Sequence, residues 1–276
     1  MHHETGTATT ADDLEVVTRS WTPDLEAKAF VVLVHGVHEH SGRYAGVASE
    51  LMRHGVAVRA LDLRGHGLSP GERGQIETFG DYLMDVEPVI QSALEDAAGR
   101  PVFLMGHSMG GLVVSYRTVE VGTEGLAGIV LSSPALSVDS PAVLRKLAPL
   151  VSKWLPTLPV TRVDLSKLSR DPKVGRVYKE DPLTTTQGVR ARLGHEILGA
   201  IETVREKPEA FDVPLLVYHG TADVITNPEG SKWITDHASS EDVTLALYDG
   251  LYHETHNELE RNQVIGALAD WIEARS

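Results

Sequence analysis

The stretch LMGHSMGG, residues 104–111, decides the fold of this chain. It ends an apolar run, precedes a helical pattern and places a serine in the sequence G-x-S-x-G. A tight strand-to-helix turn of this kind holds the serine in strained backbone geometry with its hydroxyl exposed. The flanking glycines let neighbouring backbone pass without a Cβ clash, and the helix that begins here favours negative charge nearby. The stretch therefore predicts that Ser108 is a nucleophile at the end of a buried strand.

On either side of this stretch, and including it, the chain has six apolar runs of strand length. Each run ends near Gly, Asp or Ser, which is typical of strands. They are residues 29–36, 56–67, 101–111, 126–135, 213–223 and 243–250. The first five are nearly continuous in hydrophobicity, as parallel strands buried on both faces are. Helical patterns lie between them and at the end, at residues 43–55, 79–99, 110–122 and 258–276. The alternation predicts an α/β fold with a mostly parallel, doubly wound sheet flanked by helices.

The pattern changes between residues 136 and 210, where no convincing strand appears. Leu144, Leu147, Val151 and Leu155 follow steps of three and four residues, which predicts an amphipathic helix ending at Pro156. A second helical pattern follows residues 184–186. We expect a helical cap inserted at 136–210 over the C-terminal edge of the sheet, between core segments 1–135 and 211–276. The apolar face of the cap, which includes Trp154, either packs on the core or docks on membranes.

Composition excludes several classes of function. The net charge of −14 argues against nucleic acid, because phosphates favour a basic patch. The chain has no cysteine, which excludes disulfides, a thiol nucleophile and thiolate metal sites. The N-terminus lacks a signal-peptide pattern, and no apolar run approaches the roughly 20 residues needed to cross a bilayer. We expect a cytoplasmic protein that contacts at most a membrane surface, with its first ten or so residues frayed.

A serine hydroxyl is a weak nucleophile at neutral pH, so Ser108 needs a base and the base needs an orienting acid. Asp223 and His253 each lie just past the end of a late strand, at the sheet edge that carries Ser108. The order Ser, Asp, His accompanies the G-x-S-x-G turn. His256 and Asp249 are the alternatives, but His253 is closer to its strand end and an acid on the preceding strand is commoner. The predicted catalytic residues are therefore Ser108, Asp223 and His253.

The loop HGVHEH, residues 35–40, carries three histidines and a glutamate, a set that is able to ligate zinc or iron. Where a G-x-S-x-G turn is present, however, this loop supplies one backbone N–H to an oxyanion hole, and the residue after the nucleophile supplies the other. That predicts Val37 and Met109 as the donors. A loop that presents the Val37 N–H is poorly arranged to converge three rings on a metal. No metal is predicted, and His35 and His40 are interpreted as hydrogen-bonded structural residues.

Seven stretches together resemble the monoacylglycerol lipase and lysophospholipase branch of the α/β-hydrolase superfamily. They are HGVHEHSGRY, DLRGHGLSPGERG, GHSMGG, SSPAL, DPL, HGTAD and GLYHETHNE. The resemblance runs from about residue 30 to the end of the chain. It implies the α/β-hydrolase fold, the same three catalytic residues and a cap that covers an apolar acyl tunnel.

The resemblance also implies that Glu39 and Arg43 lie at the polar end of the substrate site, where a glycerol head would sit. The chain departs from the family pattern H-G-x-G-E-H at His38, which replaces the second glycine. A side chain at this position predicts either a changed conformation of the oxyanion loop or a narrower head-group pocket.

The combined interpretation is a cofactor-free serine hydrolase that cleaves carboxylic esters of single-chain lipids, with monoacylglycerol split into fatty acid and glycerol. Fold and catalytic residues do not choose among ester substrates, so a lysophospholipase or broad carboxylesterase with the same residues is the alternative. A small-molecule receptor on a hydrolase scaffold is the alternative of another class. Such receptors often lack one catalytic residue, whereas all three are present here.

Overall fold

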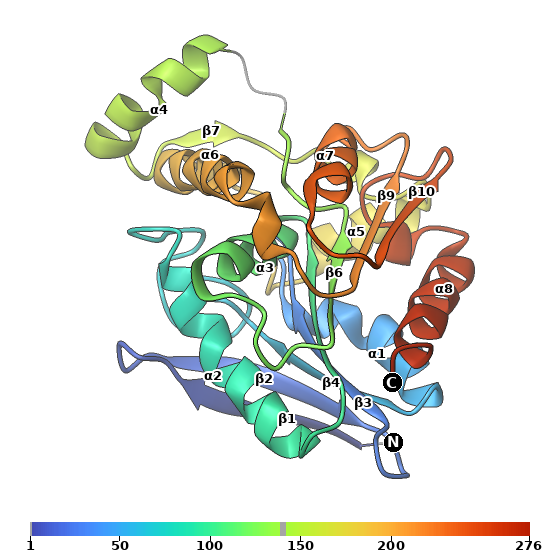
Figure 1. Cartoon of the computed structure of the whole chain (residues 1–276). Helices are drawn as coiled ribbons and strands as arrows, with labels where there is room; N and C mark the ends of the chain where they lie inside the picture. The colour runs from blue at the N-terminus through green and yellow to red at the C-terminus, as the bar shows by residue number, and fades with distance from the viewer. Residues whose placement is uncertain (1, 139–141) are drawn as a thin grey trace.

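The computed structural model describes residues 2–138 and 142–276. Its centre is an eight-stranded sheet in the order β1-β2-β4-β3-β5-β6-β9-β10 (Figure 1). The six strands predicted from apolar runs all form, and they pair in parallel with one another. They are β3 (Ala29–Val34), β4 (Val56–Leu61), β5 (Val102–His107), β6 (Gly128–Ser132), β9 (Leu215–Gly220) and β10 (Val243–Tyr248). The predicted α/β architecture is confirmed.

Helices cover both faces of the sheet, which explains why its central strands β3, β5, β6 and β9 are fully buried. In β3, Val32 and Val34 join one hydrophobic core while Val31 and Leu33 join the other, because side chains alternate along a strand. The first core lies against α2 (Asp81–Ala97) and α3 (Met109–Val121), and the second against α1 (Ala45–Arg53) and α8 (Arg261–Glu273) (Figure 1). A further helix, α7 (Glu229–His237), follows β9 and contacts β9 and β10.

The prediction that the first ten residues are frayed is wrong. They form β1 (His2–Thr9), which pairs antiparallel with β2 (Glu15–Thr22) from His2 opposite Thr22 to Thr9 opposite Glu15. Most side chains of β1 are exposed, so backbone hydrogen bonds rather than apolar burial hold this strand. β2 in turn pairs antiparallel with β4, which attaches the hairpin to the parallel sheet.

The 136–210 segment is mainly helical, as predicted. It contains α4 (Ala142–Trp154), α5 (Pro172–Glu180) and α6 (Ala191–Glu206), and α6 packs on α3. The expectation of no strand is wrong, because β7 (Pro159–Thr161) and β8 (Val189–Arg190) form a short antiparallel pair. Residues 139–141 and the side chain of Leu144 lie outside the described part of the segment. The division at residues 136 and 210 stays a prediction.

This segment contacts loops that follow the carboxyl ends of two strands. The Tyr178 hydroxyl donates a 2.8 Å hydrogen bond to the His38 carbonyl, in the loop after β3. The Glu254 N–H donates a 2.7 Å bond to the Leu168 carbonyl, in the loop after β10. Two predicted functional loops are therefore joined to one covering segment. No helix within residues 2–138 or 142–276 has the length and apolarity to cross a membrane.

Candidate active site

Ser108 lies between β5 and α3 in the strained turn that the sequence predicts. Its φ of 55° and ψ of −119° lie in a region that residues with a Cβ rarely adopt. Its N–H donates a 2.9 Å hydrogen bond to the Ser132 carbonyl of β6, and its carbonyl accepts from the Ala135 N–H at 3.0 Å. These bonds on both sides of the residue fix the unusual conformation. The expectation of an exposed hydroxyl is wrong, because Ser108 as a whole is only 6% exposed.

The two glycines of G-x-S-x-G are required by close backbone approach. A Cβ at Gly106 would lie 2.2 Å from the Gly110 carbonyl oxygen. A Cβ at Gly110 would lie 2.2 Å from the Val34 carbonyl oxygen, at the end of β3. No side chain fits at those distances, so the turn draws β3, β5 and α3 together only with glycine at both positions.

Asp223 and His253 are brought together by the loops after β9 and β10. The Nδ1–H of His253 donates to Oδ2 of Asp223 over 2.7 Å, and both side chains are at most 5% exposed. With the proton on Nδ1, the Nε2 atom of His253 is an acceptor, which is the state a general base needs. The His253 ring lies 4.8 Å from the ring of His107, the residue before Ser108. The two alternatives are placed differently: Asp249 bonds Thr221, and His256 stacks on Tyr44.

The two groups of this pair shift each other's pKa. Burial would raise the pKa of Asp223, but the facing His253 and hydrogen bonds from His219 and His253 hold it well below its ordinary value. Burial would lower the pKa of His253, but the Asp223 carboxylate outweighs burial and raises it above its ordinary value. Asp223 is therefore ionised throughout the neutral range, and it makes His253 a stronger base.

The loop after β3 closes against Ser108. A Cβ on Gly36 would lie 3.2 Å from the Ser108 Cβ, so this loop passes directly beside the serine. Val37 follows Gly36, and Met109 is the first residue of α3. The first N–H groups of a helix lack intrahelical partners, which leaves the Met109 N–H available to a ligand. Their predicted role as oxyanion donors stays a prediction.

Glu39 and Arg43 form a buried charged network behind this loop. Glu39 Oε1 accepts from the Gly36 N–H at 2.6 Å and from the Tyr44 hydroxyl at 2.6 Å. Arg43 bonds the other oxygen of Glu39 and both oxygens of Glu254, the latter two at 2.8 Å. Burial would raise the pKa of Glu39 and of Glu254, but Arg43 lowers each to about 2. Both carboxylates are therefore ionised, and both accept hydrogen bonds from groups of the protein.

His38 adopts a backbone conformation that ordinarily favours glycine. Its φ of 64° is in the left-handed region, and its side chain is buried. Its ring packs toward Gly74, where a Cβ would lie 3.0 Å from the His38 Nε2. Its carbonyl accepts hydrogen bonds from the Tyr178 hydroxyl at 2.8 Å and the Thr185 N–H at 3.1 Å. The 136–210 segment therefore holds the predicted oxyanion loop by its backbone.

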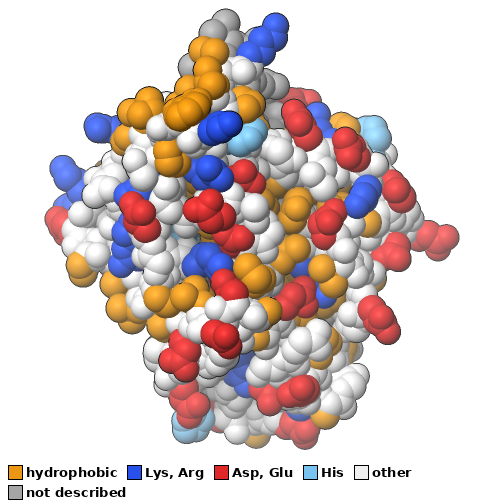
Figure 2. Space-filling model, turned by 90° about the vertical axis from the view of Figure 1, so that its left-hand side faces the viewer, with side chains coloured by type: hydrophobic (Ala, Val, Ile, Leu, Met, Phe, Trp, Pro, Cys, Tyr) orange, Lys and Arg blue, Asp and Glu red, His pale blue; other side chains and the backbone are white. Residues whose placement is uncertain are grey.

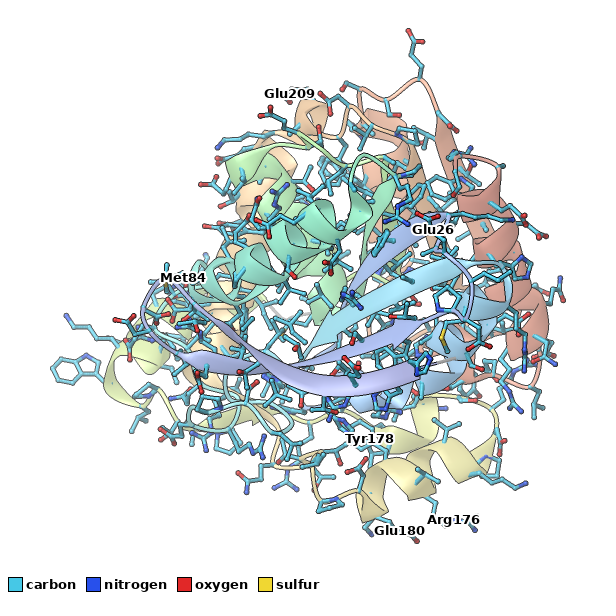
Figure 3. The ribbon with its side chains drawn as sticks, turned by 90° about the horizontal axis from the view of Figure 1, so that it is seen from below. Glu26, Met84, Arg176, Tyr178, Glu180 and Glu209 are labelled. Atoms are coloured by element: carbon cyan, nitrogen blue, oxygen red, sulfur yellow. The ribbon has the colours of Figure 1, made fainter. Side chains whose placement is uncertain are left out.

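Tyr178 reaches the site because it lies on the buried face of α5. Figure 3 shows Tyr178 pointing from α5 into the molecule, whereas Arg176 and Glu180 point away from it. Tyr178 is 5% exposed, and its ring lies 4.7 Å from the Arg43 guanidinium carbon. The ring and the hydroxyl thus contact the charged network and the loop at once. Sequence reasoning did not identify this residue, since nothing in its surroundings indicates where α5 docks.

Two of the three histidines of residues 35–40 have separate hydrogen-bond partners for their rings, which argues against a shared metal. His35 bonds the Gly36 carbonyl through Nδ1 at 2.7 Å and the Leu63 N–H through Nε2 at 3.0 Å. His40 bonds Asp181 through Nε2 at 2.9 Å. The interpretation of His35 and His40 as structural residues agrees with these bonds.

Known proteins resemble this chain over almost its whole length. The family model described as serine aminopeptidase, S33 matches residues 25–260. A monoacylglycerol lipase of Mycolicibacterium smegmatis is 36% identical over 263 residues, 94% of this chain and 93% of the relative. A human monoglyceride lipase is 35% identical over 271 residues, 96% of this chain and 89% of the relative. The crystal structure of a Paleococcus ferrophilus monoacylglycerol lipase superimposes with a TM-score of 0.84 at 33% identity, covering 95% of this chain and all of that one.

Proposed function

The chain belongs to the monoacylglycerol lipase branch of the α/β-hydrolase superfamily, and from this premise we propose that it hydrolyses monoacylglycerols to fatty acid and glycerol. It is a serine ester hydrolase. The observation that carries the assignment of residues is the 2.7 Å Asp223–His253 hydrogen bond, at the sheet edge that holds Ser108 in its strained turn. No metal or organic cofactor enters the proposed chemistry.

In the proposed mechanism, Ser108 Oγ attacks the ester carbonyl while His253 Nε2 accepts its proton. Asp223 holds the Nδ1–H of His253 and stabilises the imidazolium that forms. The N–H groups of Val37 and Met109 bind the oxyanion, a contribution of about 2.7–4 kcal/mol for each donor. His253 then protonates the leaving glycerol oxygen, and water attacks the acyl-enzyme by the same route. Glu39 and Arg43 are proposed to form the polar end of the site, where the glycerol head binds.

Ser108→Ala tests the nucleophile. We expect kcat on a monoacylglycerol to fall by at least about 10⁴-fold, because no other group replaces the attacking oxygen. The matched control is Ser92→Ala, since Ser92 is exposed on α2 and should leave kcat unchanged. A fluorophosphonate should label the wild-type and Ser92→Ala proteins, and Ser108→Ala should remain unlabelled. Hydrolysis retained by Ser108→Ala would disprove the mechanism and favour a different nucleophile.

A substrate series tests the proposed substrate class. We expect kcat/KM to rise with acyl length for monoacylglycerols and to drop for di- and triacylglycerols, because the acyl tunnel that the family resemblance implies would accept one chain. Lysophosphatidylcholine and a short p-nitrophenyl ester belong in the same series. A profile that is flat across chain length and head group would instead identify a broad carboxylesterase, and a preference for the lysophospholipid would identify a lysophospholipase.

We also propose that the chain works in the cytoplasm and meets lipid surfaces through α4. On α4, Leu147, Leu150 and Trp154 are 46%, 57% and 70% exposed, and Leu155 follows at 56%. Figure 2 shows hydrophobic side chains gathered on the projecting part of the molecule. Lys153 lies beside Trp154. Exposed Leu and Trp bordered by lysine are typical of a helix that rests in the interface of a bilayer.

Leu150→Ser with Trp154→Ser tests this contact. We expect the double variant to lose co-sedimentation with phosphatidylcholine vesicles while it retains activity on a dispersed soluble ester. Val121→Ser is the matched control, because Val121 is 53% exposed at the end of α3. Equal sedimentation of the α4 variant and wild type would rule out α4 as the contact.

A further inference from the structure

A second imidazole, that of His219, shares the carboxylate oxygen that holds His253. His219 Nε2 lies 2.9 Å from Oδ2 of Asp223, and the His219 side chain is fully buried. His253 Nδ1 reaches the same oxygen at 2.7 Å. We propose that His219 is a positioning residue, which fixes the orientation of Asp223 and limits the negative charge that Asp223 presents to His253. This inference rests on the proposed function, because it takes Asp223 and His253 as the acid and base.

The protonation of His219 follows from its two partners. An ionised carboxylate only accepts hydrogen bonds, so Nε2 of His219 must carry a proton. Its Nδ1 lies 2.7 Å from the Ser231 Oγ, and Ser231 is fully buried on α7. In the neutral ring Nδ1 has no proton, so it accepts from the Ser231 hydroxyl. The Asp223 carboxylate therefore selects the tautomer of His219, and the Ser231 hydroxyl, which is able to donate or accept, donates to the ring nitrogen without a proton.

His219 is the second donor to the Oδ2 atom of Asp223, and its Nε2 proton has no competing acceptor as strong as this carboxylate. Thr226 Oγ1 lies 2.9 Å from this oxygen but also 3.1 Å from the Ser133 carbonyl, and it has one proton for both acceptors. The other oxygen of Asp223 accepts from the N–H groups of Ile225 and Thr226, at 2.7 and 3.1 Å. Without His219, the carboxylate would keep its backbone bonds but lose the donor that opposes His253 across Oδ2.

The effect on His253 has a definite sign. A hydrogen bond from a neutral donor stabilises the Asp223 anion and weakens its pull on the His253 proton. Removing that donor should raise the pKa of His253. The other titratable groups that face His253 are Glu254, Glu39, His107 and His256, and a His219 variant retains all four. A shift in the pH profile therefore reports the Asp223 environment.

His219→Leu and His219→Gln test the proposal with a water-soluble p-nitrophenyl ester. For the leucine variant we expect kcat to fall on the order of tenfold or more, KM to change little, and the acidic limb of kcat/KM to move to higher pH. Glutamine carries an amide N–H that can donate to Asp223, so it should restore most of kcat and the wild-type limb. Ser231→Ala should shift the limb in the same direction by less. The control is His237→Leu, which removes an exposed imidazole of α7.

Unchanged kcat and an unchanged acidic limb in a folded His219→Leu protein would overturn the proposal. If circular dichroism shows that this variant is unfolded, Ser231→Ala decides alone, and an unmoved limb counts against the role of His219. Failure of the proposed function looks different. In that case Ser108→Ala keeps its activity, or the wild-type protein resists the fluorophosphonate, whatever the His219 variants do.

Discussion

The backbone conformation of Ser108 depends on the absence of a Cβ atom at Gly106 and Gly110. Its positive φ is retained because the flanking glycines let β3, β5 and α3 approach within distances that exclude any Cβ. Only glycine satisfies this requirement, so the G-x-S-x-G motif is enough to predict the turn from the sequence. His219 was not predicted, because its role depends on the side chain of Ser231, which a helix not expected from the sequence brings to it.

Gly106→Ala and Gly46→Ala should have opposite effects on stability. The added methyl at residue 106 would lie 2.2 Å from the Gly110 carbonyl, so we expect a loss of folding free energy on the order of 3 kcal/mol or more. Gly46 lies in α1 with open space around its missing Cβ, so alanine there should stabilise by about 0.5–1 kcal/mol. Urea unfolding followed by circular dichroism measures both. Equal stabilities of the two variants would contradict the packing argument.

The helices and strands that can be predicted from the sequence are those whose apolar side chains become buried. The six parallel strands are predictable because each is an apolar run of strand length, and the first five are nearly continuous in hydrophobicity. β1 is not predicted because its polar, exposed residues are ordered by backbone pairing with β2, and backbone hydrogen bonds leave no hydrophobic pattern in the sequence. The short β7–β8 pair is not predicted for the same reason. How α5 docks on the core was likewise unpredictable, since it depends on the fold of the loops beneath it.

Tyr178→Phe should loosen the link between α5 and the loop after β3. The variant keeps the ring over Arg43 but loses the 2.8 Å bond to the His38 carbonyl, which retains the Thr185 N–H. We expect about 1 kcal/mol less stability and a severalfold lower kcat, because the loop that carries the proposed oxyanion donor Val37 is less well fixed. Arg176→Ala, an exposed change on the opposite face of α5, is the control. If Tyr178→Phe has the kcat of wild type, the tether does not position the loop.

The molecule as a whole contains many ionisable groups that folding has buried. Burial lowers the pKa of His38 and of His256 to about 4, so both rings are neutral in the folded protein near pH 6. The unfolded chain, whose histidines titrate near 6.5, therefore binds more protons below that pH. Asp85 opposes this trend, because burial raises its pKa to about 6 and its contribution to stability grows as the pH falls toward 4.

We predict that the melting temperature falls steadily as the pH is lowered from 6.5 to 4. Each of the two buried histidines contributes on the order of 3 kcal/mol at most to this loss, and Asp85 and His253, whose pKa values are raised by folding, offset part of it. Calorimetry at half-unit steps of pH measures the slope. His256→Gln should flatten the slope, whereas His237→Gln, which removes an exposed ring, should not. A melting temperature that is constant over this range would contradict the assignment of neutral buried rings.

Arg43 joins two parts of the site that chain order separates. Through Glu39 it holds the loop beside Ser108, and through Glu254 it holds the residue that follows His253. Substitutions at Glu39 and Glu254 should therefore show epistasis, with a coupling energy of about 0.5–3 kcal/mol in a double-mutant cycle. For directed evolution of this scaffold, the loops after β3 and β10 are one unit of variation, and we expect libraries that randomise only one of them to sample mostly disrupted proteins.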